Sequence, residues 1–127
     1  MPLEIVRNDI TSMKVDAIVN SANPRPVIGG GVDAAIHAAA GRKLLEARRR
    51  IGEIAVGDAA ITRGGRLASR YVIHTVGPLW KGGASNEAHR LGLCYSRSLD
   101  LARRKRCRSV AFPLVSTGAY GFPKDLA

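Results

Sequence analysis

Cysteine, histidine and long apolar stretches are scarce in this sequence. Two cysteines, Cys94 and Cys107, and three histidines occur among 127 residues. Their spacing fits neither a disulfide scaffold nor a set of metal ligands. No apolar run approaches the ~20 residues of a membrane-spanning helix, and the sequence does not open with the basic-then-apolar pattern of a signal peptide. We therefore expect a cytoplasmic domain that needs no metal or other cofactor and has no membrane partner.

Acidic residues are also few, since 10 Asp and Glu stand against 20 Lys and Arg, which gives a net charge of +10. Such an excess is typical of proteins that bind nucleic acid, but it also suits a small phosphorylated ligand or an arginine-rich surface without a partner. The densest basic cluster, 103–106 with Arg108, ends a helical pattern, where cations complement the helix dipole. Aromatic residues are not interleaved with this cluster, which argues against a platform for stacking single-stranded bases.

The length and the order of the predicted elements favour one α/β domain that spans residues 1–127. Apolar, β-branched segments alternate with helical patterns, as they do in a mostly parallel sheet covered by helices. Gly41 separates two predicted helices, and Asn86 is a favourable N-cap for the third. The predicted strands are 3–6, 17–20, 59–62, 71–76 and 109–112, and the predicted helices are 32–40, 42–51 and 87–104.

Two glycine-bearing loops follow predicted strands. The glycines at 29–31 come after the strand that ends at Asn20 and lead into a helix, and the loop 116–121 follows the strand near Val115. Backbone amides and the positive end of a helix dipole bind anions at such places, so the two loops together suggest a diphosphate. Each loop alone is more often a plain turn, and neither carries the Gly-Lys-Ser/Thr or Gly-x-Gly-x-x-Gly motif of common nucleotide sites.

Asn20, Asn23, Asp33 and His37 form a candidate polar constellation near the first of these loops. Asp33 and His37 are four residues apart and therefore share a helix face. An ionised aspartate could orient or deprotonate a water molecule, and asparagines offer neutral donors and acceptors. The same residues also have structural explanations, because Asp is favoured in the first turn of a helix and Asn is common in turns. The spacing alone favours the structural explanation.

Several motifs follow one another along the whole chain in a specific order. They are Asp9-Ile10-Thr11, 15–20, Asn23, Gly29-Gly30-Gly31-Val32-Asp33 with Ile36-His37, 73–78 and Ser116-Thr117-Gly118-Ala119-Tyr120-Gly121. In this order they resemble the macrodomain family, and most of all its MacroD-type branch, which includes bacterial O-acetyl-ADP-ribose deacetylases. The resemblance implies a three-layer α/β/α fold with a mixed, mostly parallel sheet. It also implies an enzyme that binds ADP-ribose or O-acetyl-ADP-ribose and hydrolyses acyl or ADP-ribosyl esters at the distal ribose.

The resemblance implies a role for each matching residue. Asp9 would accept a hydrogen bond from the adenine amino group, with Ile10 beside it. Asn23 and Asp33 would hold the distal ribose and the attacking water, while Asn20 and His37 support them. A phosphate oxygen of the substrate is an alternative to Asp33 as the base. The diphosphate would be wrapped by Gly29, Gly30, Gly31 and Val32 and by Ser116, Thr117, Gly118, Ala119 and Tyr120, with Tyr120 also against the distal ribose.

Family members continue past the Tyr120 loop through a helix, a strand inside the sheet and a closing helix, and the resemblance implies that this chain is C-terminally incomplete without them. The predicted strand 3–6 would then lack its neighbour, so we expect self-association through the incomplete sheet. Asn8, Ile28 and Ala35 stand where glycine is common in the family. A non-catalytic ADP-ribose reader and an inactive fragment are the alternatives to a hydrolase. An ADP-ribosylated protein or nucleic acid is an alternative partner, and a nucleic-acid-binding module is a third class, which rests on charge alone.

Overall fold

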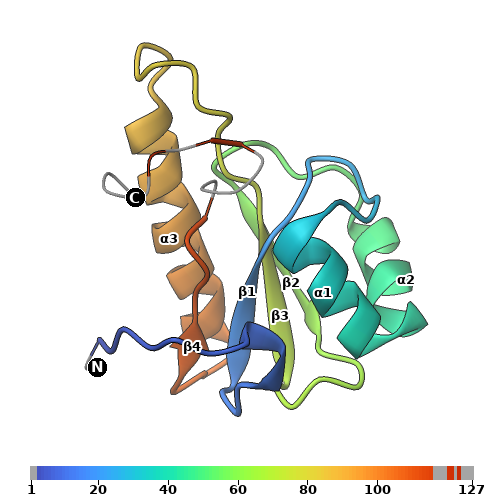
Figure 1. The fold of residues 1–127 in the computed structure, drawn as a ribbon. Helices are drawn as coiled ribbons and strands as arrows, with labels where there is room; N and C mark the ends of the chain where they lie inside the picture. Colours follow the sequence, from blue (N-terminus) through green and yellow to red (C-terminus); the bar gives the residue numbers. More distant parts are fainter. Residues whose placement is uncertain (1–2, 116–119, 122, 124–127) are drawn as a thin grey trace.

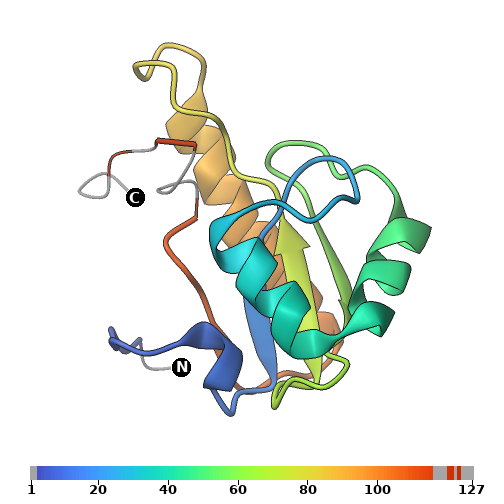
Figure 2. The same cartoon turned by 45° about the vertical axis from the view of Figure 1, so that its right-hand side comes forward.

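The computed structural model describes residues 3–115, 120, 121 and 123 and arranges them in three layers (Figure 1). Helices α1 and α2 cover one face of a central sheet and α3 covers the other, as the two views in Figures 1 and 2 show. The α/β fold predicted from the sequence is thereby confirmed. The elements are the 3-10 helix η1 (Ile10–Ser12), β1 (Ala17–Ser21), α1 (Gly31–Ala40), α2 (Arg42–Ile51), β2 (Ala59–Arg63), β3 (Tyr71–Thr75), α3 (Glu87–Arg104) and β4 (Val110–Ala111).

The described strands form one mixed sheet in the order β2-β3-β1-β4. β1 is parallel to β3 and β4, whereas β2 is antiparallel to β3. A central strand with helices on both sides must be apolar on both faces. β1 meets this condition, because Ile18 packs in one cluster with Ile36 of α1 while Val19 packs in another with Ala102 of α3. Val19 also lies opposite Ile73 of β3 in register, so the core continues across the sheet.

Gly41 is the joint between α1 and α2. Its φ of 90° lies in the left-handed region, where glycine is favoured, and it ends one helix and begins the next. Its amide donates to the carbonyl oxygen of His37, and its own carbonyl oxygen accepts from the amide of Leu44. The predicted boundary between these two helices is confirmed.

Residues 3–6 do not form the predicted strand. Leu3 and Ile5 are 91% and 97% exposed, and none of the described strands pairs with this segment. The alternating side chains favour a strand locally, but extended backbone needs a neighbour for its amide and carbonyl groups. The strand predicted at 109–112 is likewise shorter than expected, since pairing with β1 is limited to Val110–Ala111.

The start of α3 is held by a different side chain from the one predicted. Asn86 occupies the N-cap position, but its φ is 65° and its side chain makes no capping hydrogen bond. Glu87, which is 1% exposed, instead accepts hydrogen bonds from the amides of Lys81, Gly83 and Ser85. These bonds, led by the one from Lys81, lower the pKa of Glu87. The buried carboxylate therefore organises the loop that precedes the helix.

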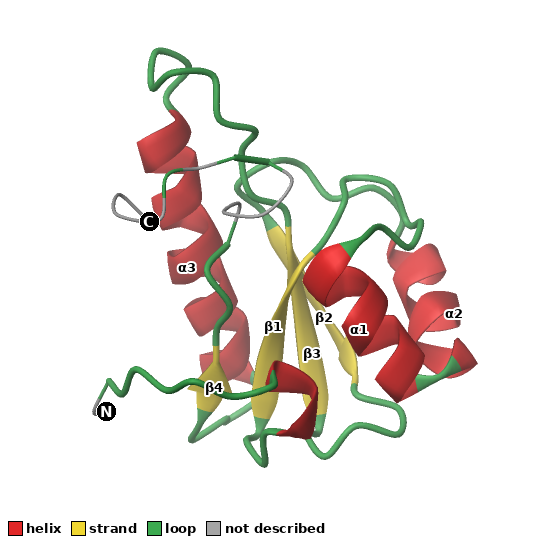
Figure 3. Cartoon of the chain, in the orientation of Figure 1, coloured by secondary structure: helices red, strands yellow, loops and turns green. Residues whose placement is uncertain are grey.

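The carboxyl ends of the parallel strands β1 and β3 meet at one edge of the sheet (Figure 3). The loop 22–30 leaves β1 there and returns to the first turn of α1. Open parallel sheets bind ligands at this edge, and the polar residues predicted from the sequence lie around it. No helix in the described part of the chain is long and apolar enough to cross a membrane.

Candidate functional site

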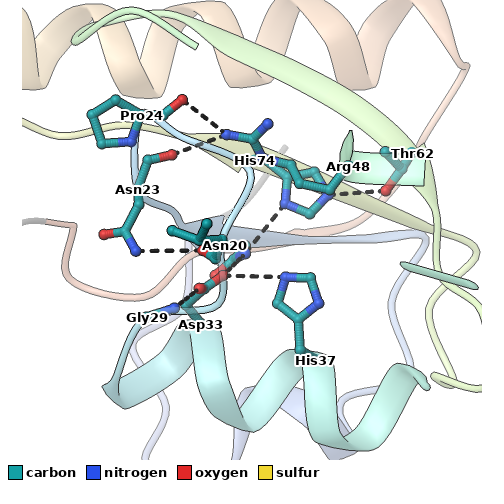
Figure 4. Close-up of polar contacts among 10 residues, drawn as sticks. Asn20, Asn23, Pro24, Gly29, Asp33, His37, Arg48, Thr62 and His74 are labelled. Carbon is teal, nitrogen blue, oxygen red and sulfur yellow. Dashed lines mark hydrogen bonds and ion pairs between the residues drawn. The ribbon is translucent and has the colours of Figure 1, made fainter. Parts of the chain in front are cut away.

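The carboxylate of Asp33 is the centre of a hydrogen-bonded network at the start of α1 (Figure 4). Asp33 is 4% exposed. Its Oδ1 accepts from Nδ2 of Asn20 at 2.7 Å, and its Oδ2 accepts from the amide of Gly29 at 2.7 Å. The carboxylate thus joins β1, the following loop and α1. The donors and the positive end of the helix dipole together stabilise this buried acid.

A chain of buried side chains continues from Asn20 into the sheet. Nδ2 of Asn20 lies 3.2 Å from Nδ1 of His74, and Nε2 of His74 lies 3.0 Å from Oγ1 of Thr62. Because Nδ2 of Asn20 is a donor, Nδ1 of His74 is the acceptor and Nε2 carries the proton. Burial lowers the pKa of His74 to about 3, and the neighbouring Arg48 and His37 add to the effect. The neutral ring holds the amide of Asn20 in one orientation.

His37 lies one turn after Asp33 on the same face of α1, as its spacing predicts. Its Nε2 is 3.4 Å from Oδ1 of Asp33. Burial lowers the pKa of His37 although Asp33 opposes the shift, so the ring is neutral at pH 7. Nδ1 of His37 and Oδ1 of Asn20 are buried and have no hydrogen-bond partner among the described residues. These two acceptors can each accept a hydrogen bond from a water molecule or a ligand hydroxyl.

Asn23 lies between the glycine loop and Tyr120. The hydroxyl of Tyr120 donates to Oδ1 of Asn23 at 3.4 Å, and Nδ2 of Asn23 donates to the carbonyl oxygen of Val27 at 3.4 Å. A Cβ at Gly29 would lie 2.6 Å from Nδ2 of Asn23, so a larger residue at position 29 would displace the amide. Tyr120 therefore joins the site, whereas Ser116, Thr117, Gly118 and Ala119 of the predicted phosphate loop lie outside the described residues.

Arg48 of α2 completes the support of this loop, and it was not among the residues predicted from the sequence. It is 2% exposed and its Nη2 donates to the carbonyl oxygens of Asn23 and Pro24 at 2.9 and 3.2 Å. Its Nη1 donates to the carbonyl oxygen of Gly52. Burial lowers the pKa of Arg48, but a guanidinium in a protein keeps its proton. The signal in the sequence for the burial of Arg48 was its position four residues after Leu44, because residues four apart lie on the same face of a helix.

A separate cavity of about 390 Å³ opens between η1 and α1 and contains the predicted residues Asp9, Ile10 and Val32 in its lining. The amide and the hydroxyl of Thr11 donate to Oδ1 of Asp9 at 3.0 and 2.8 Å. These bonds, with the hydroxyl contributing most, lower the pKa of Asp9, so the cavity has an ionised acceptor at its edge. Ala35 also lines this cavity, where the resemblance led us to expect glycine.

Gly30 and Gly31 lie at the first turn of α1, and their amides have no hydrogen-bond partner within the described residues. No three His, Cys, Asp or Glu side chains gather as a metal-binding group in that part of the chain.

The predicted residues thus fall into two neighbouring groups. One group surrounds the carboxylate of Asp33 and comprises Asn20, Asn23, Gly29, Asp33, His37 and Tyr120. The other group lines the cavity and comprises Asp9, Ile10 and Val32.

Comparison with known proteins gives consistent matches. The sequence profile described as Macro domain matches residues 19–127. An O-acetyl-ADP-ribose deacetylase of Citrobacter rodentium (strain ICC168) is 53% identical over 129 residues, which cover 98% of this chain and 73% of that protein.

Two solved structures have the same fold. A macrodomain of Oceanobacillus iheyensis, solved with ADP, superposes with a TM-score of 0.87 at 42% identity, over 91% of this chain and 65% of that one. A macrodomain of Trypanosoma brucei in complex with ADP-ribose superposes with a TM-score of 0.86 at 43% identity, over 92% of this chain and 48% of that one. The chain therefore spans less than two thirds of the length of these two structures.

Proposed function

Because the chain belongs to the macro domain family, we propose that it binds ADP-ribose and hydrolyses an acyl or ADP-ribosyl ester at the distal ribose. The observation that carries the proposal is the buried carboxylate of Asp33, which is fixed by Asn20 and Gly29 beside the amide of Asn23. The similarity to an O-acetyl-ADP-ribose deacetylase and to macrodomains solved with ADP and with ADP-ribose supports the ligand class.

Three adjacent parts of the structure fit the adenine, the diphosphate and the distal ribose of ADP-ribose. The cavity between η1 and α1 takes the adenine, whose amino group donates to Asp9. The diphosphate lies at the start of α1, where unpaired amides and the helix dipole favour an anion. The amide of Gly29 is engaged with Asp33, so the amides of Gly30 and Gly31 are the ones assigned to the phosphates. The distal ribose then reaches the network around the carboxylate.

In the proposed reaction a water molecule attacks the acyl carbon of the ester. The bond between that carbon and the ribose oxygen breaks, and the proton released by the water ends on the freed ribose hydroxyl. The products are a carboxylic acid and ADP-ribose. Asp33 orients the water and Asn23 holds a ribose hydroxyl. The base is either Asp33 or a phosphate oxygen of the bound substrate, and replacing Asp33 separates these two roles.

Calorimetric titration with ADP-ribose, with AMP as the control ligand, tests the binding. We expect saturable binding of ADP-ribose and weaker binding of AMP, which lacks the second phosphate and the distal ribose. Release of acetate from O-acetyl-ADP-ribose tests the chemistry. Asp33→Ala should lower turnover about 10²-fold or more, as expected for a positioned catalytic group, and change ADP-ribose affinity far less. An equal loss of binding and turnover would assign Asp33 a purely structural role.

A non-catalytic ADP-ribose reader is the second candidate. It is favoured by the fact that both oxygens of Asp33 already accept hydrogen bonds from the protein, which leaves fewer lone pairs for a water molecule. A reader would bind ADP-ribose as tightly as the enzyme does. It would release no acetate above the rate of the spontaneous reaction, and Asp33→Ala would leave that rate unchanged.

A further inference from the structure

We propose that the end of the molecule opposite the Asp33 network is a docking face for the phosphate backbone of a nucleic-acid duplex. This basal face is formed by three segments: the start of α2 (42–43), the turn from β2 to β3 (63–70) and the end of α3 with the turn to β4 (103–108). Figure 1 shows these turns at the lower end of the sheet, away from the carboxyl ends of β1 and β3. The segments hold ten of the 20 Lys and Arg of the chain, all of them exposed.

Contacts join the three segments into one continuous edge. A Cβ on Gly41, which precedes α2, would lie 3.7 Å from Cδ of Arg66 in the turn 63–70. Asp16 bridges this turn to the end of α3, because its carbonyl oxygen accepts from the amide of Arg70 and its Oδ2 accepts from the amide of Arg108. The cations of the basal face therefore belong to one surface and not to separate loops.

Two of these cations are held in place by an aromatic ring. The guanidinium carbons of Arg63 and Arg70 each lie 5.6 Å from the centroid of the Tyr71 ring. Tyr71 itself packs against the core cluster that contains Ala102 near the end of α3. Cation–π contacts restrict the two side chains while leaving their donors exposed, so less conformational entropy is lost when they bind a phosphate.

The positive charge of the basal face is not neutralised within the protein. The ion pair found among the described residues joins Asp58 to Arg97, and the close contact of Asp33 with the neutral His37 lies at the other site, so neither involves a cation of this face. Asp16 lies within the face, but its Oδ2 accepts from the backbone amides of Arg108 and Ser109. The face is therefore a concentrated positive patch that favours a polyanion.

A groove extends the basal face along the edge of the sheet. It has a volume of about 470 Å³ and lies between α2 and β2. Its charged lining residues are Lys43, Glu46, Arg50 and Arg63, and its uncharged ones are Ala47, Ile51, Ile61 and Thr62. The excess of cations along this groove favours binding of the phosphate groups of one nucleic-acid strand. It continues directly from the basal face, since Lys43 and Arg63 belong to both.

The chemistry of the face favours a duplex over a single strand. Single-strand sites combine cations with aromatic rings on which bases stack. Here the Tyr71 ring is covered by guanidinium groups and is half-buried, so it offers no stacking surface. Contacts through phosphates alone are typical of binding that does not depend on base sequence, and a duplex presents its phosphates outward.

Fluorescence anisotropy with a labelled DNA duplex of about 20 base pairs tests the proposal over a series of salt concentrations. We expect log K to fall linearly with log salt concentration. The pairs Arg63→Gln/Arg70→Gln and Arg104→Gln/Arg108→Gln should each weaken binding and reduce the slope by about 1.8, because each lost phosphate contact contributes about 0.9. The control pair Arg49→Gln/Arg90→Gln removes the same charge from exposed positions outside the face and should change the slope little.

Four results would overturn the proposal. They are an equal loss of affinity in the control pair, stronger binding of a single strand of the same length, displacement of the duplex by saturating ADP-ribose, and equally tight binding to phosphatidylserine vesicles. The first would indicate a net-charge effect, the third would place the duplex in the ADP-ribose site, and the fourth would indicate a membrane surface. Titration of the same variants with ADP-ribose keeps this test independent of the proposed enzyme activity.

Discussion

Arg48 holds the main chain of Asn23 in place through a hydrogen bond of 2.9 Å from its Nη2 to the carbonyl oxygen of Asn23. The donor is a buried cation on α2, and the acceptor belongs to the loop that positions the side chain of Asn23 against Tyr120. The planar guanidinium also reaches Pro24 and Gly52, so one side chain fixes the backbone at both ends of this region. A helix that lies outside the proposed ligand contacts therefore controls the position of a site residue.

Replacing Arg48 with methionine should destabilise the protein by about 2 kcal/mol, because buried carbonyl oxygens lose their donor. Arg48→Lys keeps the positive charge but loses the planar guanidinium with its several donors, so it should destabilise the protein less than Arg48→Met does. Denaturant unfolding measures both values. The dissociation constant of ADP-ribose should be lowest for the native protein, higher for Arg48→Lys and highest for Arg48→Met. If Arg48→Met lowered stability and left ligand affinity unchanged, Arg48 would support only the fold.

Gly29→Ala should impair the site through a direct collision. The added Cβ would lie 2.6 Å from Nδ2 of Asn23, so the amide must move out of its present position. We expect at least a tenfold loss of turnover on O-acetyl-ADP-ribose, in line with the contribution of a positioned catalytic group.

Gly92→Ala is the matched control for this substitution. A Cβ at Gly92 would meet no atom within 4 Å beyond its chain neighbours and the backbone of its own helix, and the residue lies exposed within α3. This change should stabilise the protein by about 0.5–1 kcal/mol, because alanine favours a helix over glycine, and leave turnover unchanged. Equal turnover in the two variants would mean that the position of Asn23 does not limit the reaction.

The local elements that depend on short-range signals could be predicted from the sequence. The boundary at Gly41 followed from its conformational freedom, and α3 was found over its full length because its apolar residues recur at helical spacing. The pairing of Asp33 with His37 also followed from spacing. In contrast, the strand predicted at 3–6 depended on a neighbour in the sheet, which local sequence does not specify, and in the described structure that segment has no strand partner.

The supporting residues of the site were harder to predict because they act over long sequence separations. Arg48 lies four residues after the buried Leu44, which is a weak signal for the buried face of α2, but the run Arg48-Arg49-Arg50 does not indicate which loop the buried arginine contacts. Thr62 reaches Asn20 only through His74, across three strands of the sheet. At α3, Asn86 occupies the predicted N-cap position without a capping hydrogen bond, and Glu87 instead organises the preceding loop through its contact with the amide of Lys81.

Self-association of the chain is a further prediction, which rests on its exposed apolar N-terminal segment. Leu3 and Ile5 are almost fully exposed, and β4 pairs only with β1 among the described strands. Apolar side chains beside an unpaired strand edge favour contact with another chain. Sedimentation velocity should show a mass that increases with concentration. Leu3→Lys/Ile5→Lys should reduce it, whereas Glu4→Lys, which removes no apolar surface, should not. A monomer at all concentrations would contradict the prediction.

Stability should fall on mild acidification because His74 is buried as the neutral ring. Its pKa is lowered from 6.5 to about 3, so the unfolded chain binds a proton at pH values where the folded protein does not. Stability is therefore complete above about pH 6.5 and is lost as the pH falls toward 3, at up to ~1.4 kcal/mol per pH unit. At pH 5 the expected loss is about 2 kcal/mol from this residue. The lowered pKa of His37 acts in the same direction.

Urea unfolding at a series of pH values separates His74 from other titrating groups. His74→Gln should lower stability at pH 7, because Asn20 and Thr62 lose a partner, but it should also reduce the decline between pH 6.5 and 5. His89→Gln is the control, since His89 is exposed on α3, and it should leave the pH dependence as in the native protein. An unchanged decline in His74→Gln would assign the acid sensitivity to His37 or to the carboxylates, and the neutral, proton-donating role of His74 toward Thr62 would have to be abandoned.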